Sequence, residues 1–480
     1  MAHAASDLNH GRLDEAAAQL TLAESRIPSA PLARRRRLVV ATASLRLALA
    51  RHNGQFSEVI EQANLLDASI SGEAGDRLAL SGELRAVALL NLGIVETWSG
   101  RLADADRHLS EGAALAQAIG RPYLEVACRA HQGFPSNTVS MAAARERGLQ
   151  AVALAERYGL DDQPILAPAF GSVAGMSIWM GEFDEGERWL QRAREIEEAR
   201  IDPAARVLLH TVTGMLHAGR GQHQSALAAF AAAAQVESRL TGVHALASLI
   251  TPWLAATQAR LGRTDVARAS LAAFSATPER MVDVCNARAV IAMAEDDPAT
   301  ALDELLGVRD STPRTGPAFK LVESHLLAGI AHLRLGDSKA AAVEAEAALA
   351  AAEPDRLILP FAMIAASELL DALPRHETAH AALLADIADV LRGDQAPSVA
   401  REQAPLLDEL SPSELRVLRY LPTNMTRHEI ASELYVSINT VNTHIRNIYS
   451  KLGARDRSSA VERAREMRLL SAGRLRTSPK

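Results

Sequence analysis

Apolar residues along this chain follow a helical period. Near the C-terminus, Val441, Ile445, Ile448 and Leu452 recur at spacings of four, three and four, which place them on one face of an α-helix. The segment ESHLLAGIAHLRLGDSKAAAVEAEAALAAAE shows the same spacings on both sides of a central turn. These patterns predict an all-α protein.

A turn residue, mostly glycine and mostly five places before a small side chain, recurs along the chain. The glycines are Gly11, Gly54, Gly100, Gly181, Gly221, Gly262 and Gly336, and the intervening positions fall on Asn137, Asp296 and His376. Their spacing is about 40 residues. Glycine, then Asn and Asp, best accept the left-handed conformation that ends a helix. Each unit is therefore predicted to be a helix, a tight turn and a second helix.

Helical hairpins with this period resemble tetratricopeptide-like repeats, in the longer form found in large bacterial regulators. The resemblance covers residues 1–392, and it implies a solenoid whose concave face binds peptides, proteins or small molecules. Another kind of α-solenoid, or a scaffold without a ligand, remains open as an alternative. Only about ten residues precede Gly11, so either the natural chain starts there or an N-terminal part is missing.

The repeat pattern stops at a polar stretch, RGDQAPSVAREQAP, that has the composition of a linker. We therefore expect a repeat domain at 1–392, a linker at 393–405, a compact domain at 406–470 and a polar tail at 471–480.

Helix-start signals predict four short helices in the compact domain. Ser411-Pro-Ser-Glu414 and Thr426-Arg-His-Glu429 are capping boxes, and Ser437 is a cap before the third helix. Asp456 or Ser458 begins the fourth helix. Only residues 435–437 separate the second helix from the third, which is the arrangement of a helix-turn-helix.

The sequences LSPSELRVLRYL and EIASELYVSINTVNTHIRNIYSKLGARDRSSAV resemble the LuxR-type DNA-binding domain over residues 406–470. One departure is TNMTRH, where the family usually has Gly and then Asn-Lys before Glu-Ile-Ala; this puts one phosphate contact in question. The resemblance implies that helix 438–452 enters the DNA major groove. It places Asn442, Thr443 and Arg446 nearest the base edges.

The same resemblance assigns DNA phosphates to a second set of residues. These are Thr426, Arg427, Asn439, Thr440, Asn447 and Lys451, with backbone N–H groups at the helix start as further donors. For Thr440, a purely structural role in the turn is an equal alternative, and His444 is expected to pack rather than to contact DNA.

The last helix resembles the family's dimer helix. Its candidate contacts are Ala460, Val461, Ala464 and Met467, and the alternative is that this side packs on the other three helices. A dimer would bind an inverted repeat with half-sites about one helical turn apart.

Composition and charge narrow the function further. Aromatic residues make up only 4% of the chain, which favours closely packed helices over a sandwich or barrel. Residues 401–480 carry a net charge of +5 on a chain of net −7, so the C-terminal end is the part suited to a polyanion. Two cysteines, no signal peptide and no apolar stretch of membrane length predict a soluble, cytoplasmic protein without a disulfide framework.

Enzymatic and cofactor motifs give weaker signals. HETAH at 376–380 matches a zinc-peptidase pattern, but His376 falls at a predicted turn and a third ligand is not evident. The Walker A motif is absent from the sequence, so the ATP switch of the large ATP-binding, maltose-regulator-like LuxR proteins is not expected here. We predict no catalytic residue, no metal site and no cofactor.

The sequence thus predicts a transcription regulator that binds double-stranded promoter DNA as a homodimer. Its repeat domain would sense an unknown small-molecule or protein effector, and RNA polymerase is a further candidate partner. The rival interpretation is a protein-interaction scaffold whose C-terminal module does not bind DNA. The acid-free face of helix 438–452 argues against the scaffold. The sequence does not reveal the effector, the operator sequence, or whether the protein activates or represses transcription.

Overall fold

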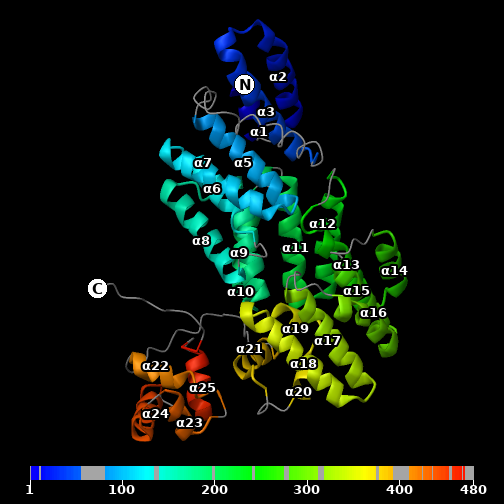
Figure 1. Cartoon of the computed structure of the whole chain (residues 1–480), viewed down its shortest axis with the longest axis vertical. Coiled ribbons are helices and arrows are strands. Elements are labelled where there is room, and N and C mark those ends of the chain that lie inside the picture. Colours follow the sequence, from blue (N-terminus) through cyan, green and yellow to red (C-terminus); the bar gives the residue numbers. More distant parts are fainter. Residues whose placement is uncertain are drawn as a thin grey trace. The chain divides into compact units, whose positions relative to one another are not determined.

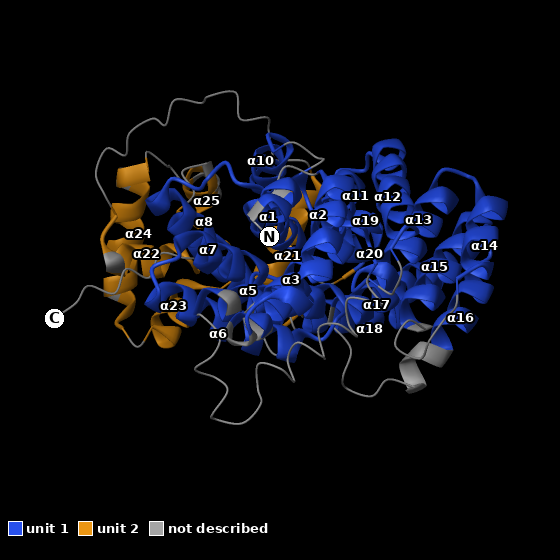
Figure 2. Ribbon diagram, turned by 90° about the horizontal axis from the view of Figure 1, so that it is seen from above, with its two compact units in different colours: residues 1–372 blue, residues 373–480 orange. Residues whose placement is uncertain are grey.

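A computed structural model describes most of the chain, and the chain divides into two compact units at residues 1–372 and 373–480 (Figures 1 and 2). The described residues are 2–9, 12–55, 82–134, 140–196, 200–240, 244–274, 281–311, 318–373, 378–392, 410–423, 425–434, 436–452, 457–466 and 469–470. Throughout these ranges the regular structure is helical, and none of their helices combines the length and apolar character that crossing a membrane requires. The domain boundaries at 392 and 405 stay predictions.

The first unit consists of helices joined into hairpins. In chain order they are α1 (Ala2–Asn9), α2 (Leu13–Arg26), α3 (Leu32–His52), α5 (Gly82–Trp98), α6 (Leu102–Ala118), α7 (Pro122–His131), α8 (Met141–Tyr158), α9 (Ala167–Trp179), α10 (Phe183–Arg194), α11 (Pro203–Gly219), α12 (His223–Glu237), α13 (Ala247–Arg260), α14 (Thr264–Ala272), α15 (Met281–Ala294), α16 (Pro298–Ser311), α17 (Ala318–Arg334), α18 (Ser338–Ala352), α19 (Leu359–Met363) and α20 (Ser367–Asp371).

The predicted turn residues lie between the two helices of each hairpin. Gly100, Gly181, Gly221, Gly262 and Gly336 all have positive φ, and each connects an odd-numbered helix to the next even-numbered one. Asp296 takes the same place between α15 and α16, with φ of 61°. An aspartate tolerates this region better than most side chains. The prediction is thus confirmed at these positions, while Gly11, Asn137 and His376 lie outside the described residues.

Small residues five places after these turns allow the paired helices to pack closely. Five of them are alanines that are at most 3% exposed: Ala105, Ala226, Ala267, Ala301 and Ala341. Glycines within the helices also allow the paired helices to pack closely. A methyl group added at Gly214 of α11 would lie 2.4 Å from the Phe230 ring of α12. The hairpin interfaces therefore depend on small residues at the contact as much as on large apolar ones.

The first helices of successive hairpins pack on one another, as α9 does on α11, α13 on α15 and α15 on α17. An aromatic group joins them: the Trp179 ring lies 4.7 Å from Phe319 and 5.9 Å from Trp253 between ring centroids. The chain after α18 then returns to this layer, because the Ile358 backbone N–H donates to the Trp179 carbonyl at 2.8 Å. As a result α19 packs against α9, α11 and α17.

The second unit contains α21 (Ala381–Leu391) and the compact module α22 (Pro412–Leu418), α23 (Arg427–Glu433), α24 (Ile438–Leu452) and α25 (Arg457–Glu466). One apolar core joins the four module helices. Its buried members include Val417, Leu418, Leu421, Ile430, Ala431, Val441, Ile445, Ile448, Leu452, Ala460 and Ala464. The predicted four-helix arrangement is confirmed.

Both predicted capping boxes are present in the module. Ser411 and Glu414 exchange side-chain to backbone hydrogen bonds at the start of α22, and Thr426 and Glu429 do so at the start of α23. Each box satisfies backbone N–H groups that would otherwise lack a partner in the first turn.

Arg457, at the start of α25, closes the irregular segment between α22 and α23. Its guanidinium donates to the carbonyls of Tyr420, Leu421, Thr423 and Met425 at 2.7–3.1 Å. Four acceptors around one planar cation form a bonding pattern that lysine does not reproduce.

We predict that Gly214→Ala destabilises the hairpin α11–α12 by about 1 to 3 kcal/mol, because the new methyl group overlaps the Phe230 ring. Hydrogen exchange of peptides from both helices measures the change. Gly175→Ala is the matched control: its added methyl lies 3.3 Å from one Val212 methyl, and the change should stay within about 1 kcal/mol. Equal effects would contradict the packing argument.

We also predict that Arg457→Lys weakens the module by about 2 kcal/mol or more, since a lysine leaves several of the four carbonyls without a donor. Faster hydrogen exchange should appear in peptides from 420–434. Arg463→Lys, an exposed position on the same helix, serves as the control and should leave the rates unchanged.

Candidate nucleic-acid interface

The rotation of α24 is set by its apolar stripe. Val441, Ile445, Ile448 and Leu452 are at most 4% exposed and lie in the module core. Because a helix buries one face at a time, the positions between them must point away from that core. The polar face predicted from the sequence is therefore the face that α24 turns outward.

The residues predicted to read bases lie on this outward face. Thr443 and Arg446 are exposed, and Asn442 is half-buried beside them. Asn442 and Thr443 lie four and three positions before Arg446, so each is a neighbour of Arg446 on the helix surface. No acidic residue occurs anywhere in α24. The structure thus brings together one guanidinium, one carboxamide and one hydroxyl with no carboxylate on the same helix.

The start of α23 lies next to this face. The Arg427 guanidinium donates to the Asn442 side-chain oxygen at 3.2 Å, which links a predicted phosphate contact to a predicted base contact. Thr426 is exposed and serves as the N-cap of α23, with its hydroxyl accepting from the Glu429 backbone N–H. Both residues are therefore at the edge of the outward face of α24.

Thr440 has a structural role at the start of α24. Its backbone N–H donates to the Ser437 hydroxyl at 3.1 Å, and the two hydroxyls are 2.8 Å apart. The predicted cap at Ser437 is confirmed. Asn447 is half-buried, and the Asn439 side chain lies outside the described residues. The phosphate assignments to these three residues stay predictions.

Lys451 has a partner within the module. Its ammonium donates to Glu414 of the first capping box at 2.9 Å, and Glu414 is only 4% exposed. Burial by itself would raise the pKa of Glu414, but the hydrogen bonds from Ser411 and Lys451 outweigh it and hold the pKa at about 2. Lys451 therefore stabilises the packing of α24 on α22, a role that its position in the sequence did not suggest. If Lys451 also binds a DNA phosphate, it does so while paired with Glu414.

The predicted dimer helix corresponds to α25. Ala460 and Ala464 are fully buried in the module's own core, and Val461 packs against that core. This is the packing that the alternative interpretation expected. Met467 lies outside the described residues, and a dimer contact through α25 stays a prediction.

Candidate metal and thiol chemistry has little support in the described part of the chain. His380 precedes α21 as its N-cap residue, and His376 lies outside the described residues. Among the described residues, no three His, Cys, Asp or Glu side chains gather as a metal site would require. Cys128 and Cys285 are free and buried, and burial raises the pKa of both thiols.

Comparison with known proteins assigns the module. A family model described as bacterial regulatory proteins, luxR family, matches residues 408–464. The probable transcriptional regulatory protein NarL of Mycobacterium tuberculosis is 39% identical over 84 residues, which are 18% of this chain and 39% of that protein. The HTH-type transcriptional regulator MalT of Serratia proteamaculans is 40% identical over 68 residues, which are 14% of this chain and 8% of that protein.

Two solved structures are similar to a larger part of the chain. The apo form of the quorum sensor NprR from B. thuringiensis matches with a TM-score of 0.48 at 11% identity, over 73% of this chain and 96% of that one. A Rap protein complexed with competence and sporulation factor matches with a TM-score of 0.47 at 12% identity, over 73% and 96%.

The relatives matched in sequence share with this chain well under two thirds of their own length, and the family match lies in the C-terminal module. That module has the four helices, the capping boxes and the family match expected from its sequence. Residues 408–464 are a helix-turn-helix domain of the luxR family of bacterial regulatory proteins, carried by a chain whose first unit is built of tetratricopeptide-like helical hairpins.

Proposed function

We propose that this protein is a sequence-specific, DNA-binding transcription regulator. The observation that carries the proposal is the outward face of α24, where Asn442, Thr443 and Arg446 stand together without an acidic neighbour on the helix. The DNA backbone repels carboxylates and guanine offers acceptors, so a helix face with donors and no acid is suited to the major groove. The rival scaffold would need apolar anchors, and Val436 is the only large apolar side chain exposed in the described part of the module.

The proposed contacts follow from side-chain chemistry. Arg446 pairs with guanine O6 and N7, Asn442 pairs with adenine, and the Thr443 methyl meets the thymine methyl. Thr426 and Arg427 bind backbone phosphates at the edge of the same face, where they fix the register of the helix in the groove. The remaining phosphate assignments, Asn439, Thr440, Asn447 and Lys451, belong to the same proposal.

The repeat unit supplies the regulatory half of the proposal. Stacked helical hairpins form extended surfaces that commonly bind ligands or partner proteins. We propose that an effector on such a surface changes how two modules of a homodimer engage an inverted-repeat promoter site in the cytoplasm. The protein acts as a regulator and not as an enzyme, with RNA polymerase as a further partner.

We predict that Arg446→Glu weakens binding to a selected operator by at least 100-fold. The substitution removes a bidentate contact and places a carboxylate against the DNA. Fluorescence anisotropy with a labelled duplex measures the Kd. Arg416→Glu, an equal charge reversal at an exposed position on α22, is the control and should cost much less. Equal losses for the two variants would mean that net charge, and not the face of α24, determines binding.

We further predict a steep salt dependence. Each neutralised phosphate contributes about −0.9 to the slope of log K against log salt concentration, so a dimer that contacts roughly eight phosphates should give a slope near −7. Arg427→Gln should make the slope less steep by about 2, one contact in each protomer. A slope near zero would contradict binding through the phosphate backbone.

A further inference from the structure

One hydrogen bond between side chains joins the start of α23 to the outward face of α24. Arg427 Nη1 donates to Asn442 Oδ1 at 3.2 Å, across 15 residues of sequence. Both residues belong to the proposed DNA interface, Arg427 at a phosphate and Asn442 at a base. The bond therefore connects a contact that fixes the position of the helix with a contact that reads the sequence.

The chemistry of the two groups determines which way the Asn442 amide points. A guanidinium has only donors, whereas a carboxamide has an oxygen that accepts at one end and a nitrogen that donates at the other. Only Oδ1 of Asn442 can therefore face Arg427, and Nδ2 is the end turned away from it. A half-turn of the amide would place Nδ2 against the guanidinium, donor against donor. Arg427 thus selects one of the two orientations of the Asn442 side chain.

The backbones that carry the two side chains are held in place by the module. Arg427 is the first residue of α23, directly after the N-cap of its capping box. Ile430 on α23 and Val441 on α24 are fully buried in the same apolar core, and the two helices pack on each other. The bond between Arg427 and Asn442 therefore joins two positions whose separation the core determines.

Bonding to Asn442 does not prevent Arg427 from binding a phosphate. A guanidinium has five N–H donors in one plane, and the bond to Asn442 involves a single nitrogen, Nη1. Arg427 is exposed, while Asn442 is half-buried beside it. A phosphate that fixes the guanidinium from the solvent side would therefore also fix the amide behind it.

The orientation of the amide matters for the choice between adenine and guanine. Both purines present N7 to the major groove, and beside it adenine has its N6 amino group where guanine has the O6 oxygen. A carbonyl oxygen accepts two hydrogen bonds, so Asn442 Oδ1 can bind Arg427 and adenine N6 while Nδ2 donates to N7. Opposite guanine, the same orientation brings Oδ1 against O6, and two acceptors meet. Without Arg427 the amide is free to turn and to donate from Nδ2 to O6.

We propose that Arg427 is the positioning residue that makes Asn442 select adenine over guanine. Arg427 does not touch the base; it acts by holding Oδ1 of Asn442 in the accepting position. The inference rests on the proposed function and deepens it, because it names a determinant of base specificity outside the helix that enters the groove. A contact that served only the phosphate would weaken binding to every DNA sequence alike.

The test compares the Kd of the full chain for a selected operator and for operators that carry guanine in place of adenine. The base pair below Asn442 is the one at which Asn442→Ala loses its preference. There the parent should prefer adenine by at least about 10-fold, and Arg427→Gln should reduce this preference to about 3-fold or less. Glutamine is suitable because its amide both donates and accepts, so it no longer imposes one orientation. The loss of charge cancels in the ratio of the two Kd values.

Three controls separate positioning from general weakening. The preference for guanine at the base pair below Arg446 should survive in Arg427→Gln, which also reports that the module is folded. Arg416→Gln removes a charge from an exposed position on α22 and should keep both preferences. In the Asn442→Ala background, Arg427→Gln should lower the affinity without a further change in the ratio between adenine and guanine.

Three outcomes would overturn the inference alone, given a parent that binds DNA specifically. The first is an undiminished preference for adenine in Arg427→Gln. The second is an equal loss of preference below Asn442 and below Arg446, which would mean that Arg427 sets only the register of the helix. The third is that Asn442→Ala relaxes no position, or one that prefers another base. A parent that selects no DNA sequence would instead contradict the proposed function, and this inference with it.

Discussion

The burial of one stripe on α24 determines what the second unit can do. Val441, Ile445, Ile448 and Leu452 must face the core that α22, α23 and α25 complete, and this fixes the helix about its own axis. Asn442, Thr443 and Arg446 are outward as a direct consequence. Glu414 holds α24 against α22 through its ion pair with Lys451. Arg457 holds the segment between α22 and α23 through four backbone carbonyls. A module with this core presents a rigid polar face, which is what reading DNA from one helix requires.

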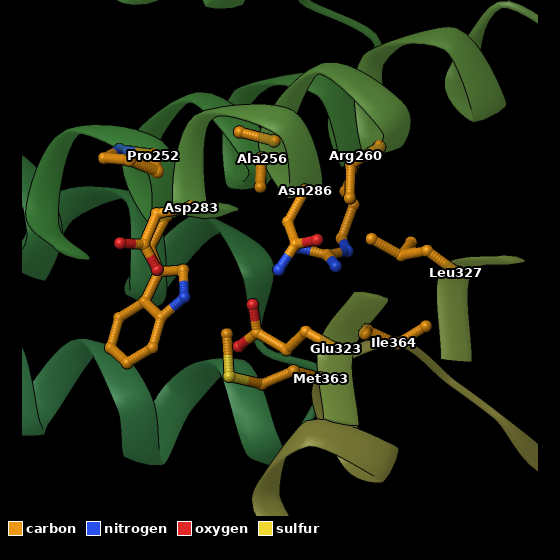
Figure 3. Close-up of a pocket in the computed structure, with 12 residues that line it drawn as sticks. Pro252, Ala256, Arg260, Asp283, Asn286, Glu323, Leu327, Met363 and Ile364 are labelled. Carbon is orange, nitrogen blue, oxygen red and sulfur yellow. The ribbon is translucent and has the colours of Figure 1, made fainter. Parts of the chain in front are cut away.

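The first unit relies on a different constraint, which is the close approach of paired helices. Left-handed turns at glycine or Asp296 reverse the chain, and buried alanines or glycines let the two helices meet. Because the same solution recurs in several hairpins, neighbouring first helices pack on one another, as α9 does on α11 and α15 on α17. Asp283, Asn286 and Glu323 are buried polar exceptions in this packing, and Arg260 lies beside them (Figure 3). Polar groups at such a place are costly unless they are hydrogen-bonded, as Asp283 is to Lys320 and Asn286 is to Ser324.

Sequence alone predicted the features that depend on local spacing. The hairpin turns, including aspartate in place of glycine at 296, and both capping boxes follow from residues within five positions of one another. The contacts of Arg457 lie 32 to 37 residues away in an irregular segment, and those of Lys451 lie 37 away, so no periodicity signals them. Arg260, Asp283 and Glu323 come from three different helices, α13, α15 and α17, so no local spacing in the sequence predicts that they lie close together. DNA contacts and a dimer through α25 stay predictions, since they depend on partners.

The most direct test of the account is the selection of genomic DNA fragments by the full chain at about 0.15 M salt, in parallel with Arg446→Glu. Arg446 is exposed, so this variant should fold as the parent does. We expect the parent to enrich a two-fold-related motif with half-sites about one helical turn apart, and the variant not to enrich it. Enrichment of the same motif by both proteins, or of none by the parent, would contradict DNA recognition by α24.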